Sequence, residues 1–299
     1  MKHKSFLLAV IALLAASCTN ESLDSSVNCS DEQGMAPVTV RVDGFEVSQG
    51  EISPSRRTTA IGDYENLEAL TLAFYKSDGT ESYKATQFKA DASTYTTFGE
   101  FSTALPMGSY TMVVLGYLVQ DDAPVAVSLT SPTSATFTEE KCRETFAATQ
   151  SFTITNNTAV NLTATLNRIV AKVVLASTDN RDPNVSSLRV TFSGGSKSFN
   201  PTTGLATDNN GYVNTLVNPH TGQTTFTSFL FLPVDEQNVN VTIQTLDANG
   251  DVLFNKTVNN VPLKRNRETK LTGALYHADN SAGSFQLNTD WLTGNVIDF

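Results

Sequence analysis

The sequence predicts an all-β protein built from two β-sandwiches, and three observations favour this fold class. Short runs of alternating apolar and polar residues recur along the chain, separated by turn residues. Charged residues make up only 17% of the 299 residues, while Thr, Ser, Asn and Val are abundant. This composition favours strands and turns over helices, and no stretch keeps the 3.6-residue period of an amphipathic helix.

The expected strands follow one another along the whole chain. Residues 38–43 alternate cleanly, and residues 70–75 are followed by a turn at residues 76–80. The run at residues 109–117 ends in six apolar residues in succession, 112–117, which is typical of a buried strand. The later runs are residues 151–155, 159–175, 188–192, 225–232, 239–246, 252–258, 269–276 and 284–288. Short helical turns are expected only at residues 64–67 and 138–149.

Two sandwiches fit this pattern better than one. The polar residues 155–159 divide the expected strands into two sets of similar number. Each set occupies a length of chain that is typical of one sandwich domain. We therefore expect an N-terminal sandwich over residues 36–157 and a C-terminal sandwich over residues 158–299.

The N-terminus has the layout of an export signal. Residues 1–17 contain a short basic start, an apolar run and small residues, as a signal peptide does. The apolar run is shorter than the roughly 20 residues that a membrane-spanning helix needs. Small residues directly before Cys18 resemble a bacterial lipobox, in which the cysteine is diacylated and becomes the new N-terminus. Residues 18–35 are then a flexible tether. The alternative is an ordinary signal peptide in which Cys18 has no role.

Charge and motifs exclude several classes of function. A formal net charge of -10 argues against nucleic acid as a partner, because its binders carry basic patches. The chain has no G-x-S-x-G motif, phosphate-binding loop or dinucleotide fingerprint. His220 and His277 have no second His or Cys at metal-ligand spacing. We therefore expect no enzyme activity, no cofactor and no metal site.

Residues 247–251, Asp-Ala-Asn-Gly-Asp, allow two interpretations. Their oxygen-bearing side chains alternate as in part of a calcium loop, but no Glu completes the pattern. Asn-Gly between two alternating runs is instead a strong hairpin signal. We therefore expect a tight turn.

The cysteines do not predict a disulfide framework. If Cys18 is acylated, Cys29 and Cys142 remain, and Cys29 lies in the tether. We expect both to be unpaired thiols.

Arg56 and Arg57 follow the first expected strand in a polar segment with Pro and Ser. The simple interpretation is a solvated loop. A basic pair in an exposed loop is also easily cut by a protease, and a cut here would separate the tether and the first strand from the rest.

Three motifs and the end of the chain carry a resemblance to a known family. They are residues 105–115 (LPMGSYTMVVL), 166–175 (LNRIVAKVVL) and 261–273 (VPLKRNRETKLTG), followed by 285–291 (FQLNTDW) and 295–299 (NVIDF). In this order and spacing they resemble the fimbrillin superfamily of Bacteroidales, whose members are stalk, anchor and tip subunits of fimbriae. With the lipobox, the resemblance spans nearly the whole chain.

The resemblance implies a fold of two tandem transthyretin-like Greek-key β-sandwich domains. It also implies export as a lipoprotein to the outer membrane surface, with other fimbrial subunits as partners. In stalk members, an Arg-specific protease removes the N-terminal segment with the first strand, and the C-terminal strand of a neighbouring subunit fills the groove. Such strand addition supplies main-chain hydrogen bonds and pockets for alternate side chains.

Carried onto this sequence, the cut falls after Arg56 or Arg57, and the removed strand is residues 38–47. The donor is residues 284–299, whose apolar residues are Phe285, Leu287, Trp291, Val296, Ile297 and Phe299. The alternative is that these residues form the last strand and a packed end. Thr58 follows Arg57, whereas the family's cleavage site has a small residue there, so the stalk, anchor and tip roles stay open.

The leading hypothesis is therefore a lipid-anchored fimbrial subunit, structural or adhesive, that contacts other subunits and a ligand on a host or bacterial surface. The alternative is a stand-alone glycan-binding surface lipoprotein of a polysaccharide-uptake system. Such binders stack sugars on exposed aromatic side chains. Tyr83, Tyr95 and Tyr117 are the candidates, but they lie in strand-like runs where core packing is expected.

Overall fold

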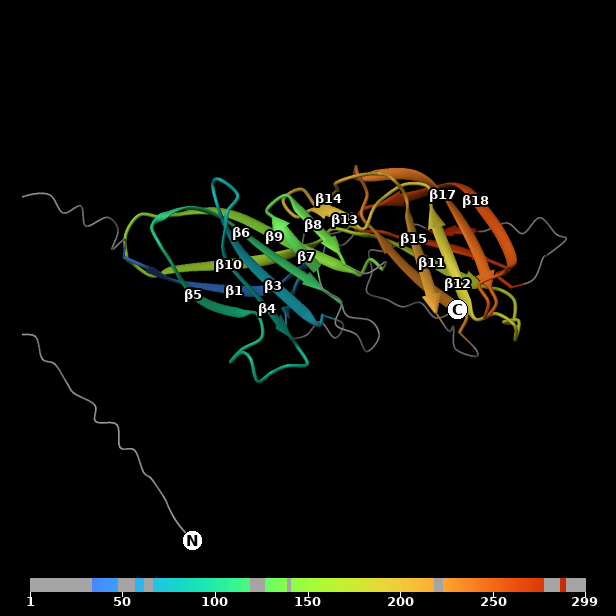
Figure 1. Cartoon of the computed structure of the whole chain (residues 1–299), viewed down its shortest axis with the longest axis horizontal. Coiled ribbons are helices and arrows are strands. Elements are labelled where there is room, and N and C mark those ends of the chain that lie inside the picture. Colours follow the sequence, from blue (N-terminus) through green and yellow to red (C-terminus); the bar gives the residue numbers. More distant parts are fainter. Residues whose placement is uncertain are drawn as a thin grey trace, which may run out of the picture. The chain divides into compact units, whose positions relative to one another are not determined.

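The computed structural model describes residues 34–47, 57–61, 67–118, 127–138, 141–217, 223–276 and 286–288 (Figure 1). In this part of the chain every regular element is a β-strand, which confirms the all-β class. The first half holds β1 (Ala36–Val47), β2 (Arg57–Ala60), β3 (Ala69–Lys76), β4 (Glu81–Phe88), β5 (Glu100–Leu105), β6 (Gly108–Tyr117), β7 (Val127–Ser131), β8 (Ser134–Phe137), β9 (Thr145–Ile154) and β10 (Val160–Arg168). The second half holds β11 (Ala171–Ser177), β12 (Ser187–Phe192), β13 (Ser198–Asn200), β14 (Leu205–Ala206), β15 (Tyr212–Val217), β16 (Thr225–Leu230), β17 (Glu236–Leu246), β18 (Val252–Lys264), β19 (Glu268–Gly273) and β20 (Gln286–Asn288). Across these ranges, no helix has the length and apolar character that crossing a membrane requires.

Most strands of the first half form one eight-stranded sheet, in the order β2-β1-β10-β9-β6-β3-β4 with β5 paired to β1. The side chain of Gln87 links β4 to the start of β5. Its amide nitrogen donates to the Glu100 carbonyl at 2.7 Å, and its amide oxygen accepts from the Gly99 N–H at 2.8 Å. Residues of β1, β3, β5, β6, β9 and β10 share one hydrophobic core. The sheet therefore encloses a core of its own.

β3 and β6 are buried on both faces. Leu72 and Phe74 of β3 belong to the core just described, whereas Ala73 and Tyr75 belong to a second core. β6 divides its side chains between the two cores in the same way. Strands covered on both faces carry apolar residues in succession rather than in alternation. The run at residues 109–117 is thus confirmed as a buried strand.

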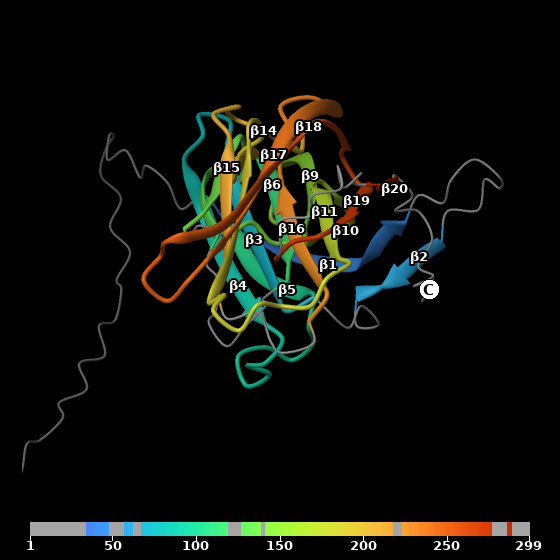
Figure 2. The same ribbon diagram turned by 90° about the vertical axis from the view of Figure 1, so that its right-hand side faces the viewer.

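The second half forms two four-stranded sheets, β16-β11-β19-β20 and β15-β12-β17-β18 (Figure 2). Leu175 and Leu271 of the first sheet and Val190 and Ile243 of the second are at most 1% exposed, and all four belong to the second core. The two sheets therefore bury their inner faces in a common core, as the sheets of a sandwich do.

A small sheet joins the two halves. Its order is β14-β13-β8-β7, so that β8 of the first half pairs with β13 of the second. Beside this pair, the rings of Phe137 and Phe231 stack with centroids 6.3 Å apart, and those of Phe199 and Phe231 stack at 4.1 Å. The second core is therefore continuous from β3 and β6 to the strands of the second half.

The turn at residues 155–159 connects two strands of one sheet. β10, which follows it, pairs with β1 and β9. The chain passes to the second half at Ile169 and Val170, between β10 and β11. Strand pairing thus assigns residues 160–168 to the first half, beyond the expected boundary at residue 157. A division into separate domains stays a prediction.

Two local expectations have opposite outcomes. Residues 145–149, expected near a helical turn, begin β9 instead, because Phe146 and Ala147 are buried in the sheet.

The expected tight turn at residues 247–251 is confirmed, since Asn249 and Gly250 join β17 to β18 and Gly250 has a φ of 88°. The Asp247 carboxylate accepts hydrogen bonds from two backbone N–H groups of this turn. These bonds hold the pKa of that carboxyl below its usual value.

Candidate functional site

β1 lies between other strands along both of its edges. On one edge it runs parallel to β10, with Val38 opposite Val160 and Val42 opposite Ala164. On the other edge, its first residues pair with the antiparallel β5, and its last residues pair with β2. We call the space that β1 fills, between β10 and the edge formed by β5 and β2, the β1 slot.

The side chains of β1 alternate between the core and solvent. Ala36, Val38, Val40 and Val42 are 0–2% exposed and belong to the core of the first half. The residues between them are exposed. Full burial of one such valine contributes about 1.5–3 kcal/mol relative to leaving it in water. β1 therefore fills a row of apolar pockets as well as a gap in a hydrogen-bonded sheet.

The walls of the β1 slot are apolar. Phe101 and Leu105 of β5 and Leu162 and Leu166 of β10 belong to the same core as the β1 valines. Without β1, the facing edges of β5 and β10 would carry unpaired N–H and C=O groups beside these side chains. An open slot of this kind is a site for strand addition.

A glycine contacts the middle of β1. β1 has a bulge between Val42 and Gly44, and the Val42 N–H donates to the Gly99 carbonyl at 2.9 Å. Gly99 has a φ of +90°, and a Cβ there would lie 3.2 Å from a methyl carbon of Ile61. A glycine is required because the left-handed backbone strains any other residue.

The predicted processing site lies directly before β2. Arg57 is the first residue of β2 and pairs with Val47 of β1, whereas Arg56 lies outside the described residues. Cys18, the predicted lipidation site, also lies outside them. A cut after Arg56 would leave β2 whole, and a cut after Arg57 would remove only its first residue.

One of the six donor-strand residues lies in a described strand. Leu287 of β20 is opposite Leu271 of β19, at the edge of the sheet β16-β11-β19-β20. Phe285, Trp291, Val296, Ile297 and Phe299 lie outside the described residues. Residues 286–288 are therefore paired within the chain's own fold here.

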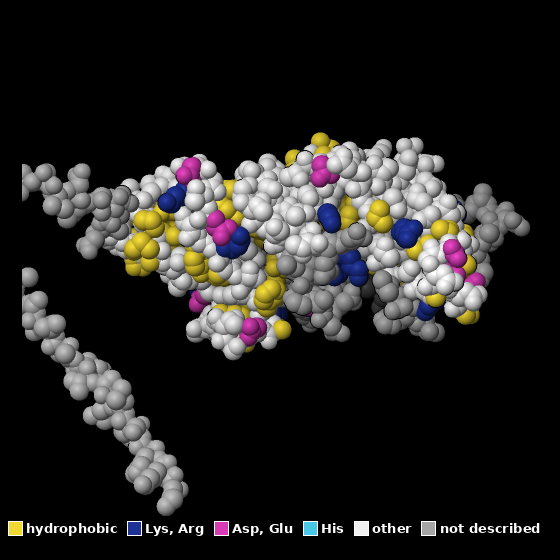
Figure 3. All heavy atoms as spheres, viewed as in Figure 1, with side chains coloured by type: hydrophobic (Ala, Val, Ile, Leu, Met, Phe, Trp, Pro, Cys, Tyr) yellow, Lys and Arg dark blue, Asp and Glu magenta, His cyan; other side chains and the backbone are white. Residues whose placement is uncertain are grey.

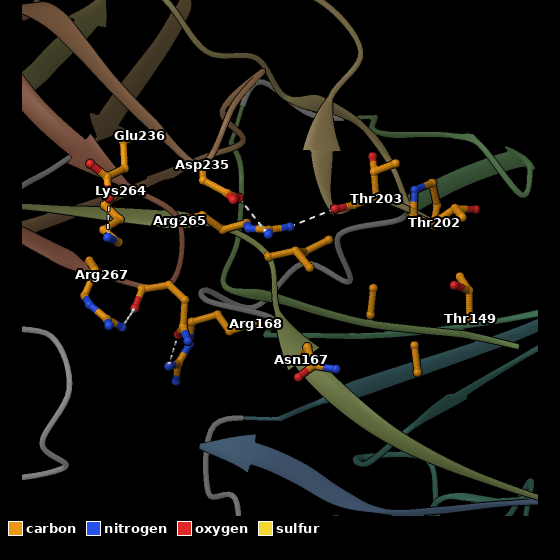
Figure 4. Close-up of a pocket in the computed structure, with 16 residues that line it drawn as sticks. Thr149, Asn167, Arg168, Thr202, Thr203, Asp235, Glu236, Lys264, Arg265 and Arg267 are labelled. Carbon is orange, nitrogen blue, oxygen red and sulfur yellow. Dashed lines mark hydrogen bonds and ion pairs between the residues drawn. The ribbon is translucent and has the colours of Figure 1, made fainter. Parts of the chain in front are cut away.

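A pocket of about 710 Å³ lies where β10 meets the β13–β14 and β18–β19 turns (Figure 4). Two of the sequence motifs meet here, since Arg168 comes from residues 166–175 and Asn266 from residues 261–273. Arg168 Nη1 donates to Asn266 Oδ1 at 3.1 Å, and Lys172 forms an ion pair with Glu268 at 2.8 Å. The motifs are therefore joined in space.

The charged side chains of this pocket are engaged with one another. Arg168 Nε donates to a Glu144 carboxylate oxygen at 2.5 Å, and its guanidinium lies 4.9 Å from the centre of the Phe146 ring. Figure 4 shows Arg265 reaching from Asp235, at 2.7 Å, to the Thr203 carbonyl, also at 2.7 Å. This arrangement is a polar joint between the halves rather than a set of groups converging on a ligand.

The tyrosines predicted for glycan stacking are covered to different degrees. Tyr117 is 2% exposed, which confirms its core packing. Tyr83 packs against Phe74 with ring centroids 6.0 Å apart, and Tyr95 packs against Phe98 at 5.6 Å; both tyrosines are partly buried. Within the described ranges, no group of three or more His, Cys, Asp or Glu side chains is placed to hold a metal ion.

Cys142 is a free, buried cysteine, as expected. Its backbone N–H donates to the Tyr212 hydroxyl at 2.5 Å, and its Sγ lies 3.7 Å from the Ser196 carbonyl. Burial raises the pKa of its thiol. Cys29 lies outside the described residues.

Sequence reasoning missed two parts of these sites. One is β5, the second neighbour of β1, whose short run alternates with Phe101 and Leu105 inward. That alternation was the available signal. The other is Glu144, whose partner Arg168 follows 24 residues later. No local pattern indicates such a pair.

The fold and the β1 slot define an all-β protein whose first described strand is seated between β10 on one edge and β5 and β2 on the other. The chain belongs to the family of unknown function DUF6562, which matches residues 38–291. No curated protein matches the chain.

Several solved structures are similar to the chain. A candidate adhesin from Bacteroides ovatus has 10% identity and a TM-score of 0.48, over 90% of this chain and 99% of that one. A candidate polysaccharide-binding protein (DUF1812) from Bacteroides thetaiotaomicron has 10% identity and a TM-score of 0.47, over 86% and 96%. The fimbrial anchor protein Mfa2 from Porphyromonas gingivalis has 11% identity and a TM-score of 0.45, over 85% and 95%. By their names, one neighbour is an adhesin, one a polysaccharide-binding protein and one a fimbrial anchor. At such identities and TM-scores, their roles do not transfer to this chain.

Proposed function

We propose that this chain is a cell-surface lipoprotein that acts as a fimbrial structural or adhesion subunit, assembled with other subunits by β-strand exchange. The seating of β1 carries the proposal. Exchange needs a strand that is hydrogen-bonded on both edges, fills apolar pockets and lies at one end of the fold in sequence. β1 pairs with β10 and β5, buries alternate residues and is the first described strand.

The predicted donor has a compatible pattern. The β1 slot accepts apolar side chains at every second position, at residues 36, 38, 40 and 42. Phe285 and Leu287 are two residues apart, and so are Ile297 and Phe299. Because side chains two apart lie on one face of a strand, either pair can enter neighbouring pockets. The donor segment is therefore residues 284–299 of a neighbouring subunit.

The proposal includes the membrane anchor and the architecture. Acylation of Cys18 holds the chain on the outer membrane, with residues 18–35 as the tether. The two halves are transthyretin-like Greek-key sandwiches, and the chain has no catalytic activity. Cleavage after Arg56 or Arg57 would make it a stalk subunit with an open slot, whereas retention of β1 and the lipid would make it an anchor.

Stand-alone glycan binding has less support. Tyr117 is buried, and Tyr83 and Tyr95 are partly covered by neighbouring rings. A stacking platform needs an exposed ring face. The described tyrosines therefore do not favour this alternative.

The test is strand exchange with purified protein. The chain is cut with an Arg-specific protease, residues up to 57 are removed in denaturant, and a fluorescent peptide of residues 284–299 is added during refolding. Anisotropy should report saturable binding to the chain without β1 and none to the uncut chain. The control peptide carries Phe285→Asp and Leu287→Asp, Ile297→Asp and Phe299→Asp. If the β1-free chain refolds and binds neither peptide, strand exchange through the slot is wrong.

A further inference from the structure

One end of the first half is formed by strand ends and turns that contain no charged residue. Ala36 at the start of β1 lies opposite Leu105 of β5, and Gly108 of β6 lies opposite Ile154 of β9. The β5–β6 turn and the β9–β10 turn therefore lie at the same end as Gly34. Residues 34–40, 101–118 and 145–167 contain no Lys, Arg, Asp or Glu, in a chain that is 17% charged. We call this end, formed by residues 34–36, 105–109 and 154–159, the uncharged end.

The uncharged end also exposes large apolar side chains. Met35 is 54% exposed and Met107 is 38% exposed, which places both among the few exposed large hydrophobic residues of the described chain. Figure 3 shows hydrophobic side chains gathered at the end of the molecule where these turns lie. Lys76 and Asp78 of the β3–β4 turn border it, because Lys76 lies opposite Tyr110. The surface is therefore an apolar patch with a charged rim on one side.

The first described residue of the chain lies at this same end. Gly34 is the first described residue, and a Cβ on it would lie 2.1 Å from the Asn157 amide in the β9–β10 turn. Cys18 lies 16 positions before Gly34. A flexible chain of that length has a root-mean-square span of roughly 20–25 Å. An anchor at Cys18 thus keeps the uncharged end nearer to the membrane than any other surface of the first half.

We propose that the uncharged end rests on the lipid bilayer when Cys18 is acylated, with Met35 and Met107 inserted at the interface; this rests on the proposed lipid anchor. The tether gives the patch a high effective concentration at the membrane, so that a weak apolar contact is populated. Flexible methionine side chains adapt to an irregular apolar surface. The absence of charge over the patch lowers the cost of removing it from water. A neighbouring subunit is the other partner that could cover it.

The test measures the environment of position 107 in the full chain on phosphatidylcholine vesicles. Met107→Cys is made together with Cys29→Ser and labelled with an environment-sensitive fluorophore. Leu253→Cys on β18 is the matched control, because Leu253 is 47% exposed. On vesicles, the label at position 107 should shift to the blue and be quenched by spin-labelled lipid, whereas the control label should do neither. Equal behaviour of the two labels would overturn the proposal.

Two further readouts separate the outcomes. A blue shift that grows with protein density on the vesicle and resists the lipid quencher identifies a neighbouring copy, and it also overturns the bilayer contact. Intact mass reports acylation of Cys18 independently. If Cys18 is not acylated, the lipid anchor of the proposed function fails. The fluorescence of the same labelled variants is then measured with a hexahistidine in place of Cys18, which binds the chain to vesicles that contain nickel-chelating lipid. Absence of lipid quenching there overturns the inference itself.

Discussion

The Arg168 guanidinium and the Glu144 carboxylate form an ion pair of 2.5 Å in which the two side chains are 15% and 9% exposed. Each group has lost most of its water, so each depends on the other for compensation of its charge. Arg168 also donates to Asn266 of the second half. The pair therefore stabilises the connection between the first and the second half of the chain.

Glu144→Gln should lower the free energy of unfolding by about 3 kcal/mol, because Arg168 would keep a largely buried charge without its partner. Urea unfolding followed by circular dichroism measures the change. Arg41→Ala is the matched control, since the Arg41–Asp43 pair is 69% and 44% exposed. That control should cost less than about 1 kcal/mol. Equal losses in the two variants would contradict this role for Glu144.

Phe137→Ala should destabilise both halves together. Phe137 is 1% exposed and stacks on Phe231 of the second half. Truncation of a buried phenylalanine costs about 3–5 kcal/mol. Hydrogen exchange in increasing urea should show β3 and β12 losing protection at the same lowered concentration. Val234→Ala, at a 52% exposed position, is the control and should change little. Loss of protection in β3 alone would mean that the halves are independent domains.

Local patterns predicted the strands in which apolar and polar residues alternate. Residues 38–43, 188–192 and 239–246 alternate in sequence, and each lies in a strand with one buried face. Sequence reasoning missed β7, β8 and β13, which are short and polar on one face. Those strands exist because Phe137 and Phe199 are covered by Phe231, a contact between distant segments that no local pattern encodes.

The same reasoning explains the partial prediction of the candidate site. The alternation of residues 38–43 marked β1 as a strand, and the basic pair lies at the start of the strand that follows it, β2. The neighbours of β1 could not be predicted, because β10 and β5 are far from it in sequence. Val38 pairs with Val160, 122 positions later, and Ala36 pairs with Leu105, 69 positions later. Long-range pairing depends on the whole sheet rather than on any one segment.

Cys142 should be inert to thiol reagents in the folded chain. Its side chain is buried, and burial raises the pKa of the thiol, so little of the reactive thiolate forms at pH 8. The measurement is iodoacetamide labelling of a Cys29→Ser chain that begins at residue 19, followed by intact mass. Labelling should occur in urea and be absent in buffer. Rapid labelling of the folded chain would show that the region around Cys142 opens readily.

Alkaline pH should destabilise the fold through Tyr75. Burial, with a smaller contribution from Glu81, raises the pKa of Tyr75 to about 12. The folded state therefore holds this proton more tightly than the unfolded state, whose tyrosine ionises near pH 10. Stability is then unaffected below about pH 10 and falls between about pH 10 and 12. Urea midpoints across this range measure the slope, which should be shallower in Tyr75→Phe. An identical slope would assign the effect to other tyrosines.

The stability of β1 in the β1 slot should depend on the buried side chains of β1. Val40→Ala removes two methyl groups from a side chain that is 0% exposed, which should weaken β1 binding by about 2 kcal/mol. After a cut at Arg56 or Arg57, the N-terminal fragment should stay bound in buffer, because β10 and β5 still hold β1 on both edges. Size-exclusion chromatography in increasing urea measures its release, which should need less urea for Val40→Ala. Thr39→Val is the control at the neighbouring exposed position and should release the fragment at the original concentration. If the N-terminal fragment of the cleaved, unsubstituted chain is released in buffer alone, the slot does not retain β1. Cleavage by itself then suffices to open the slot.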